Sequence, residues 1–248
     1  AALIPIEICN ITLGDHRRSG SVPTLLANSR HVLSALRDRI ANDFWRIVNR
    51  PPAAFTPGNP DSMLGACINL IERFSAHTGF VAENIVRGPT WRFLMIGRRV
   101  ERANNICRVA ETLGQDRNGP DDMGVLLDLF DSQIVYRARY MIAPTRDAVL
   151  DLILLDPENP RSLIFQIQEL VEDLATLPVL RDNGLPEQPL RQAHVILTEL
   201  YSLEIAALAP GRLQHIATLL IELSESISQR YFLQIEKPDE DPEDELLL

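Results

Sequence analysis

The segment from residue 91 to residue 110 constrains the fold most, because it carries an unbroken apolar stripe at helical spacing. Its apolar side chains are separated by three and four residues in alternation, which places them on one face of an α-helix. We expect this face to be buried against other helices. The stripe consists of Phe93, Ile96, Val100, Ala103, Cys107 and Ala110.

A second stripe on the same segment is mostly polar, and helical geometry turns it roughly 90° or more away from the first. Bulky neighbours such as Trp91 and Met95 lie beside this second stripe, so the sequence favours a helix that is packed on both sides. The stripe consists of Leu94, Arg98, Glu101, Asn105 and Arg108.

The acid of this stripe, Glu101, needs a partner if it is packed, because a carboxylate that leaves water must be paired. We expect an arginine of another helix to bind it, the candidates being Arg30, Arg137 and Arg139. Glu101→Gln is then expected to lower the melting temperature. The alternative is a surface helix with only weak contacts between residues three and four apart.

The rest of the chain also has helical patterns, so the predicted fold class is all-α. Only residues 8–13 have the composition of a strand, and that stretch is short. Ser21 and either Asp61 or Ser62 are expected to cap helices, and Pro51-Pro52 to end one. We predict a bundle of about seven to nine helices, with helical stretches over residues 21–50, 61–74, 89–114, 122–143, 145–155, 160–177, 189–209 and 210–235.

A short repeat lies in the loops, at an offset of 141 residues. The stretch 10–22 resembles the stretch 152–163 and pairs Asp15 with Asp156. In each, a short apolar helix meets a turn that contains Asp, and a Ser then caps the next helix. This pattern favours two pseudo-repeats, the alternative being a chance match. If the repeat is real, the first copy of the residue-97 helix is expected upstream of residue 1 and is missing here.

The net charge of −10 is concentrated near the C-terminal end, where residues 236–245 hold seven acids against Lys237. We predict a single helical domain over residues 1–235 and an acidic, disordered tail over 236–248. A nucleic-acid partner would need a basic domain and is not expected. No apolar run approaches the roughly 18 to 20 residues that cross a bilayer. Residues 1–11 also lack the basic start and cleavage pattern of a signal peptide, so the expected location is the cytoplasm. The three cysteines are far apart in the sequence, and we expect them to be reduced.

Sequence motifs for catalysis or for cofactor binding are not found. The chain has no glycine-rich phosphate loop, no Gly-x-Ser-x-Gly turn and no Cys or His pair at zinc spacing, so we expect no metal and no cofactor. Arginines outnumber acids on the polar face, which favours binding of a carboxylate or phosphate. The candidate ligand-binding residues are Arg98, Glu101, Arg102, Arg108, Tyr136, Arg137 and Arg139. The alternative is that acids such as Asp131, Asp151 and Glu111 neutralise these arginines.

Several ordered segments resemble one protein family. Residues 88–103 are similar to the hallmark E-R helix of the alpha-E domain family, a bacterial all-helical family, with Glu101 and Arg102 as the motif pair. Residues 27–45, 132–140 and 156–162 resemble its arginine-rich helix, its tyrosine-arginine helix and its Asn-Pro-x-Ser turn. The resemblance implies association with circularly permuted ATP-grasp proteins, transglutaminase-like proteins and Ntn-type peptidases. It carries over no catalytic residue.

Two functions are compatible with these patterns. The first is a non-catalytic helical module that docks on an ATP-grasp amide or peptide ligase, or on a peptidase, and holds a carboxylate or peptide for it. The second is an enzyme of peptide or amide-bond metabolism, with its site between the E-R helix and the helix of residues 132–140. A closed ion-pair network would favour the module, and a cleft with Glu101 and several arginines would favour the enzyme.

Overall fold

The computed structural model describes residues 3–115, 120–180 and 184–233, and every regular element in these ranges is helical. The predicted all-α class is therefore confirmed. Eleven α-helices occur in these ranges, more than the seven to nine expected; the acidic tail predicted at 236–248 lies outside them. The α-helices are α1 (Leu3–Gly14), α2 (Val22–Ala35), α3 (Asn42–Asn49), α4 (Pro60–Asn84), α5 (Pro89–Leu113), α6 (Pro120–Leu129), α7 (Gln133–Tyr140), α8 (Arg146–Leu150), α9 (Leu163–Ala175), α10 (Gln188–Tyr201) and α11 (Arg212–Tyr231).

The number of helices exceeds the expected number because residues 8–13, which have the composition of a strand, lie within helix α1, and because two long predicted helices are interrupted. The first breaks at η1 (Arg37–Arg39), where Arg37 Nη1 donates to the carbonyl oxygen of Ile40 at 3.0 Å. The second breaks at Asp131, which has a left-handed φ of 49°. The next N–H, of Ser132, bonds back to the carbonyl oxygen of Leu127 at 2.8 Å. Asp adopts this conformation more readily than most residues, and the backbone donor is satisfied.

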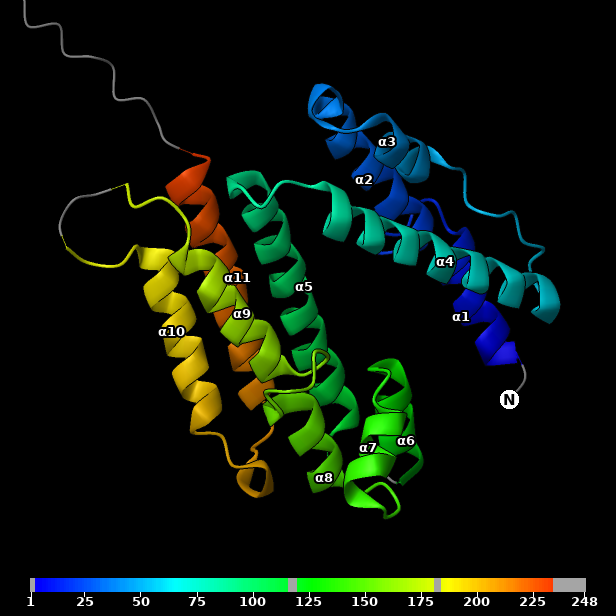
Figure 1. Cartoon of the computed structure of the whole chain (residues 1–248). Helices are drawn as coiled ribbons and strands as arrows, with labels where there is room; N and C mark the ends of the chain where they lie inside the picture. Colours follow the sequence, from blue (N-terminus) through cyan, green and yellow to red (C-terminus); the bar gives the residue numbers. More distant parts are fainter. Residues whose placement is uncertain (1–2, 116–119, 181–183, 234–248) are drawn as a thin grey trace, which may run out of the picture. The chain divides into compact units, whose positions relative to one another are not determined.

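The chain forms two compact units, residues 1–86 and residues 87–248, and each is described by itself. Figure 1 shows their helices coloured along the sequence. Unit 1 contains α1 to α4, with α1 packed on α2 and α3 packed on α4. Unit 2 contains α5 to α11. The single domain predicted over residues 1–235 stays a prediction.

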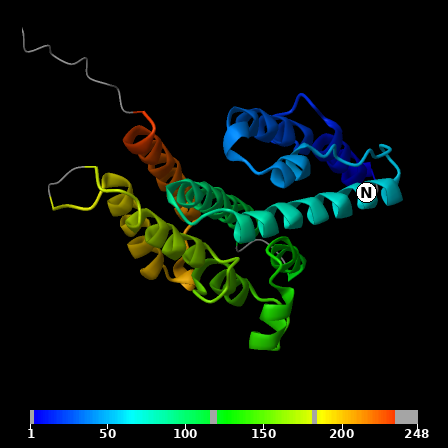
Figure 2. The same ribbon diagram turned by 45° about the horizontal axis from the view of Figure 1, so that its top comes forward.

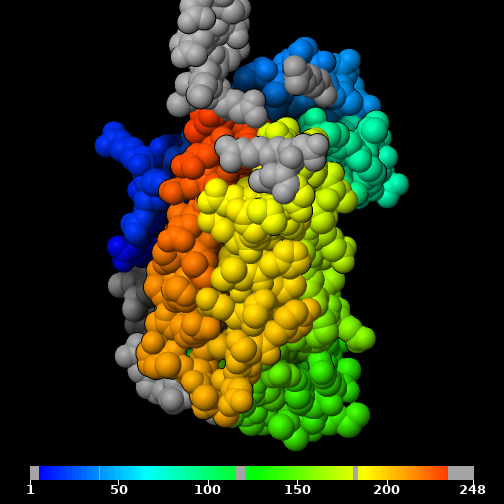
Figure 3. Space-filling model, turned by 90° about the vertical axis from the view of Figure 1, so that its left-hand side faces the viewer, coloured from blue at the N-terminus to red at the C-terminus, as the bar shows by residue number. Residues whose placement is uncertain are grey.

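Four long helices form the centre of unit 2. Helix α5 packs against α9 and α11, and α10 packs against the same two helices, so the four close into a bundle (Figures 1 and 2). Figure 3 shows α10 and α11 side by side along one face of this bundle. Helix α6 packs against α5, α7 and α8.

The predicted apolar stripe of α5 lies in the core of unit 2, as expected. Ile96, Ala103, Cys107 and Ala110 are buried, and the two remaining members of the stripe pack against the same core while partly exposed. The helix ends at Gly114, where a Cβ would lie 2.5 Å from the Ala110 carbonyl oxygen and 2.8 Å from Leu150 Cδ2. Glycine is therefore required at the end of α5 for α8 to pack there.

Helix starts follow the predicted capping chemistry with one correction. Ser21 caps α2 as expected. Helix α4 is capped by Asn59 rather than by Asp61 or Ser62, because the Asn59 side chain accepts the Ser62 N–H at 3.1 Å and Pro60 takes the first helical position. Proline fits there because its missing N–H has no helical acceptor in any case.

The two predicted repeat turns have the same hydrogen bonds. The Asp carboxylate accepts the N–H two residues later, at 2.9 Å for Asp15 and 2.9 Å for Asp156. The Ser hydroxyl six residues later donates to the Asp carbonyl oxygen, at 2.5 Å for Ser21 and 2.5 Å for Ser162. Each Ser then accepts the N–H three residues further on and so caps a helix. The local match is therefore structural, whereas a duplication of the whole chain stays a prediction.

We predict that Ser162→Ala lowers the free energy of unfolding by about 1 to 2 kcal/mol, because it removes an N-cap and the shorter of the two hydrogen bonds to the Asp156 carbonyl oxygen. Urea denaturation followed by circular dichroism measures this loss. Ser228→Ala is the control, since Ser228 is only partly buried and its hydroxyl bonds within its own helix. Equal stability of the two variants would contradict the role assigned to the turn.

Candidate functional site

The charged residues of α5 divide into two groups that face different surroundings. Arg92 and Arg99 lie against α9 and are paired with its acids. Arg98 and Arg102 belong to a second group, which also includes Arg161 from the turn before α9. We call Arg98, Arg102 and Arg161 the arginine cluster.

The first group is a closed network around one buried carboxylate, that of Asp173. Arg92 Nη1 lies 2.6 Å from Asp173 Oδ1, and Arg99 Nε lies 3.1 Å from Asp173 Oδ2. Arg99 Nη2 also donates to the carboxylate of Glu169, one turn earlier on α9. Two arginines therefore balance two acids, and the side chain of Asp173 is only 4% exposed. This network joins α5 to α9.

The expected partnership of Glu101 is wrong. Glu101 is exposed, and none of the ion pairs found in residues 3–115, 120–180 and 184–233 includes it. Arg99 is the buried charge of α5 instead. It lies three residues after Ile96 and four before Ala103, so helical geometry places it on the core stripe. Glu101 is two residues from Arg99 and two from Ala103, so helical geometry turns its side chain away from the core.

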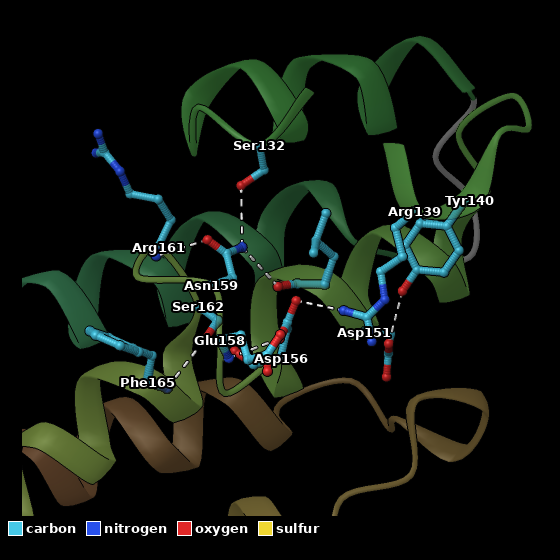
Figure 4. A network of polar contacts seen from close by, with 11 residues as sticks. Ser132, Arg139, Tyr140, Asp151, Asp156, Glu158, Asn159, Arg161, Ser162 and Phe165 are labelled. Carbon is cyan, nitrogen blue, oxygen red and sulfur yellow. Dashed lines mark hydrogen bonds and ion pairs between the residues drawn. The ribbon is translucent and has the colours of Figure 1, made fainter. Parts of the chain in front are cut away.

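The turn before α9 is built from the buried polar side chains of Asp156, Asn159 and Ser162. Figure 4 shows their contacts. Asp156 accepts from Arg139 Nη1 at 2.6 Å, and Asn159 Nδ2 donates to the Leu152 carbonyl oxygen at 3.1 Å. Asn159 Oδ1 accepts the N–H of Arg161 at 3.0 Å. The side chain of Arg161 points away from these contacts in Figure 4. The turn thus fixes the backbone from which this arginine projects.

Most of the candidate residues of α7 form hydrogen bonds with protein groups near this turn. The Tyr136 hydroxyl is engaged with the backbone on both sides, donating to Ala143 and accepting from Thr145, each at 3.2 Å. The Tyr140 hydroxyl donates to Asp151 at 3.0 Å, and burial first, then this bond, raises the pKa of Tyr140 to about 12. Arg139 holds Asp156 in the turn. Arg137 is exposed, and its ligand-binding role stays a prediction.

The arginines of the cluster lie close enough for their charges to affect the pKa values of Arg98 and Arg102. Burial, followed by the charges of Arg99 and Arg161, lowers the pKa of Arg98. Arg102 is exposed as a residue. Partial desolvation, followed by the charges of Arg98, Arg161 and Arg99, lowers its pKa to about 10, so its guanidinium is still charged at neutral pH. The charges that lower these two pKa values are all those of arginines. Arg161 also lies beside an acid, the exposed Asp131, at 3.3 Å.

The sequence patterns of α5 and α7 do not indicate Arg161, because this residue lies in the turn before α9. Its signal was the repeat turn, whose buried Asp, Asn and Ser hold the intervening residues in fixed positions. The remaining candidate of α5, Arg108, is exposed and lies six residues beyond Arg102. It does not contribute to the lowered pKa values of the cluster.

Nucleophilic chemistry is unfavourable in this region. Burial raises the pKa of the Cys107 thiol to about 12, so the thiolate is scarce at neutral pH. In the part of the chain that the structure describes, His, Cys, Asp and Glu form no group of three that could hold a metal ion. In the same part, no helix has both the length and the apolar character to cross a membrane.

The fold and the site define an all-helical protein with an arginine cluster beside its Glu-Arg helix. The chain belongs to the alpha-E family, described as a predicted alpha-helical domain with a conserved ER motif, whose model matches residues 5–232. Among curated relatives, uncharacterized proteins of Mycobacterium tuberculosis (Rv2567) and Mycobacterium bovis (Mb2597) are each 26% identical over 240 residues. The match covers 91% of this chain but only 27% of each relative. No solved structure matches the chain.

We predict that Asp173→Asn destabilises unit 2 by about 3 to 5 kcal/mol, because it leaves the charges of Arg92 and Arg99 without their shared acid. Thermal and urea unfolding measure the loss. Glu101→Gln is the matched control and should change the free energy of unfolding by less than about 0.5 kcal/mol, since that side chain is exposed. A larger loss from Glu101→Gln than from Asp173→Asn would restore the expectation made from the sequence.

Proposed function

We propose that this chain is a non-catalytic helical module that binds an oxyanion-bearing ligand or partner segment through the arginine cluster. The observation that carries the proposal is that Arg98, Arg102 and Arg161 lie close enough for their positive charges to lower the pKa of Arg98 and of Arg102. A carboxylate or phosphate would relieve this repulsion and accept several N–H donors at once.

Binding is favoured over catalysis by how the other polar groups are used. Arg92 and Arg99 form ion pairs with Asp173 and Glu169, and the tyrosine hydroxyls of α7 form hydrogen bonds with protein groups. A guanidinium stays protonated at neutral pH and cannot act as a general base there. An enzyme site between α5 and α7 would need a free base or nucleophile, and no observation favours one.

The proposed partner is a circularly permuted ATP-grasp amide or peptide ligase, as the family resemblance implies, with a transglutaminase-like protein or an Ntn-type peptidase as the other choices. The module would hold the carboxylate of a peptide or amino acid for the partner. The match covers 27% of each curated relative, which supports a module that works beside other domains. We place this system in the cytoplasm, where ATP is available and free cysteines such as Cys9, Cys67 and Cys107 persist.

We predict that Arg102→Ala and Arg161→Ala each weaken binding of the anionic ligand about tenfold or more, because each removes a charge-assisted hydrogen bond. Isothermal titration with inorganic phosphate, glutamate and short peptides measures the affinity. A pull-down with the ATP-grasp protein tests the partner. Both variants should keep the wild-type melting temperature within a few degrees, since neither residue is in the core.

Arg108→Ala is the control, because Arg108 is an exposed arginine of the same helix outside the cluster. It should bind as the wild type does. Arg139→Ala is not a suitable variant, since it also removes the partner of the buried Asp156. Affinity that is unchanged in Arg102→Ala and in Arg161→Ala would exclude the cluster as the site.

A further inference from the structure

The end of α3 in unit 1 is capped by arginine side chains. A helix leaves its last carbonyl oxygens without intrahelical donors. Pro51 and Pro52 follow α3 and have no N–H to offer. Arg73 Nη2 from α4 therefore donates to the Val48 carbonyl oxygen at 2.5 Å, and Arg30 Nη2 from α2 donates to the Arg50 carbonyl oxygen at 3.1 Å.

Arg73 and Arg30 have more hydrogen-bond donors at the end of α3 than the carbonyl oxygens there accept. Arg73 is 4% exposed, and its Nε and Nη1 bond to no atom of the described residues. Nε carries one N–H and Nη1 carries two, so three buried donors of one guanidinium remain. The Nε of Arg30 is likewise buried and without an acceptor there. Buried donors on a charged group destabilise a fold unless an acceptor is supplied.

The charges that act on the pKa of Arg73 are also positive. Burial, followed by the charges of Arg30 and Arg50, lowers the pKa of Arg73. The negative end of the α3 dipole supplies only about half an elementary charge. The acid on α3, Asp43, lies in an exposed pair with Arg46 at 3.5 Å.

His77, one turn after Arg73 on α4, does not add to the cationic charge. Burial lowers the pKa of His77, a hydrogen bond with the Ile47 backbone opposes this, and the charge of Arg73 lowers it further. The imidazole is therefore neutral at physiological pH. The cations at this place are the arginines, and the missing component is an anion that accepts hydrogen bonds.

We propose that Arg73 and Arg30 bind a small oxyanion, a carboxylate or a phosphate group, beside the C-terminal end of α3. An oxyanion suits the site because it has acceptors only, with enough lone pairs to take several N–H donors at once. A carboxylate can come from a peptide or metabolite, and a phosphate from a phosphorylated one. This site lies in unit 1, uses none of the residues of the arginine cluster and stands independently of the proposed function.

Arginine side-chain NMR tests the site directly. The Nε–H signals of Arg73 and Arg30 are assigned from their loss in Arg73→Met and Arg30→Met. They are then followed in the full chain during titration with inorganic phosphate or acetate, with sodium chloride matching the ionic strength. We expect both signals to shift and saturate with phosphate, acetate or both. A response to phosphate alone identifies a phosphate group, and a response to acetate identifies a carboxylate site.

Affinity measured on other signals of unit 1 should fall about tenfold or more in Arg73→Met and in Arg30→Met. It should be unchanged in Arg46→Met, where the arginine is exposed, and in Arg102→Ala, which tests the arginine cluster. If Arg73→Met does not fold, Arg30→Met and Arg73→Lys provide the same comparison. The absence of a shift with either anion, or full affinity in both methionine variants, would show that these arginines only cap α3.

Discussion

The buried carboxylate of Asp173 is the contact on which the bundle of unit 2 depends. It binds two arginines of α5 that are seven residues apart, and Arg99 extends the contact to Glu169. Such a pair contributes little net stability compared with well-packed apolar residues, but losing one member is costly. Its main effect is to fix the register of α5 against α9. That register decides which arginines of α5 face the core and which face outward.

The turn before α9 also uses buried polar groups to position helix α9. Asp156, Asn159 and Ser162 are buried and bonded to backbone groups, so the turn has a fixed shape although it is a loop. It sets the start of α9, and with it the position of Asp173, and it also fixes the backbone of Arg161. One set of buried polar contacts therefore aligns the helices and assembles the arginine cluster.

Much of the fold was predictable, because helix limits depend on local chemistry. Ser21, Gly114 and the prolines that open helices are read directly, and the apolar stripe of α5 follows from spacing. The break at η1 was not predictable, since it has neither proline nor glycine and rests on a side-chain bond of Arg37. The break at Asp131 was not predictable either, because it requires a left-handed backbone conformation, which Asp can adopt but does not prefer.

The site was predicted in part, and the error has a simple cause. The Glu-Arg pair drew attention to Glu101, whereas the buried charge is the neighbouring Arg99. Helical spacing places Arg99 on the core stripe of α5, and it places Asp173 on the core stripe of α9, three residues after Leu170. Two opposite charges on the buried faces of two helices indicate an ion pair between them. The role of Arg161 needed the three-dimensional turn.

The central claim is that the inward arginines of α5 hold the bundle together while the outward ones bind an oxyanion. A crystal structure of the chain grown with phosphate or glutamate tests it most directly. The account predicts that Asp173 still binds Arg92 and Arg99, and that the anion contacts Arg102 and Arg161. An anion bound elsewhere, with Glu101 or another acid paired to Arg102, would contradict it.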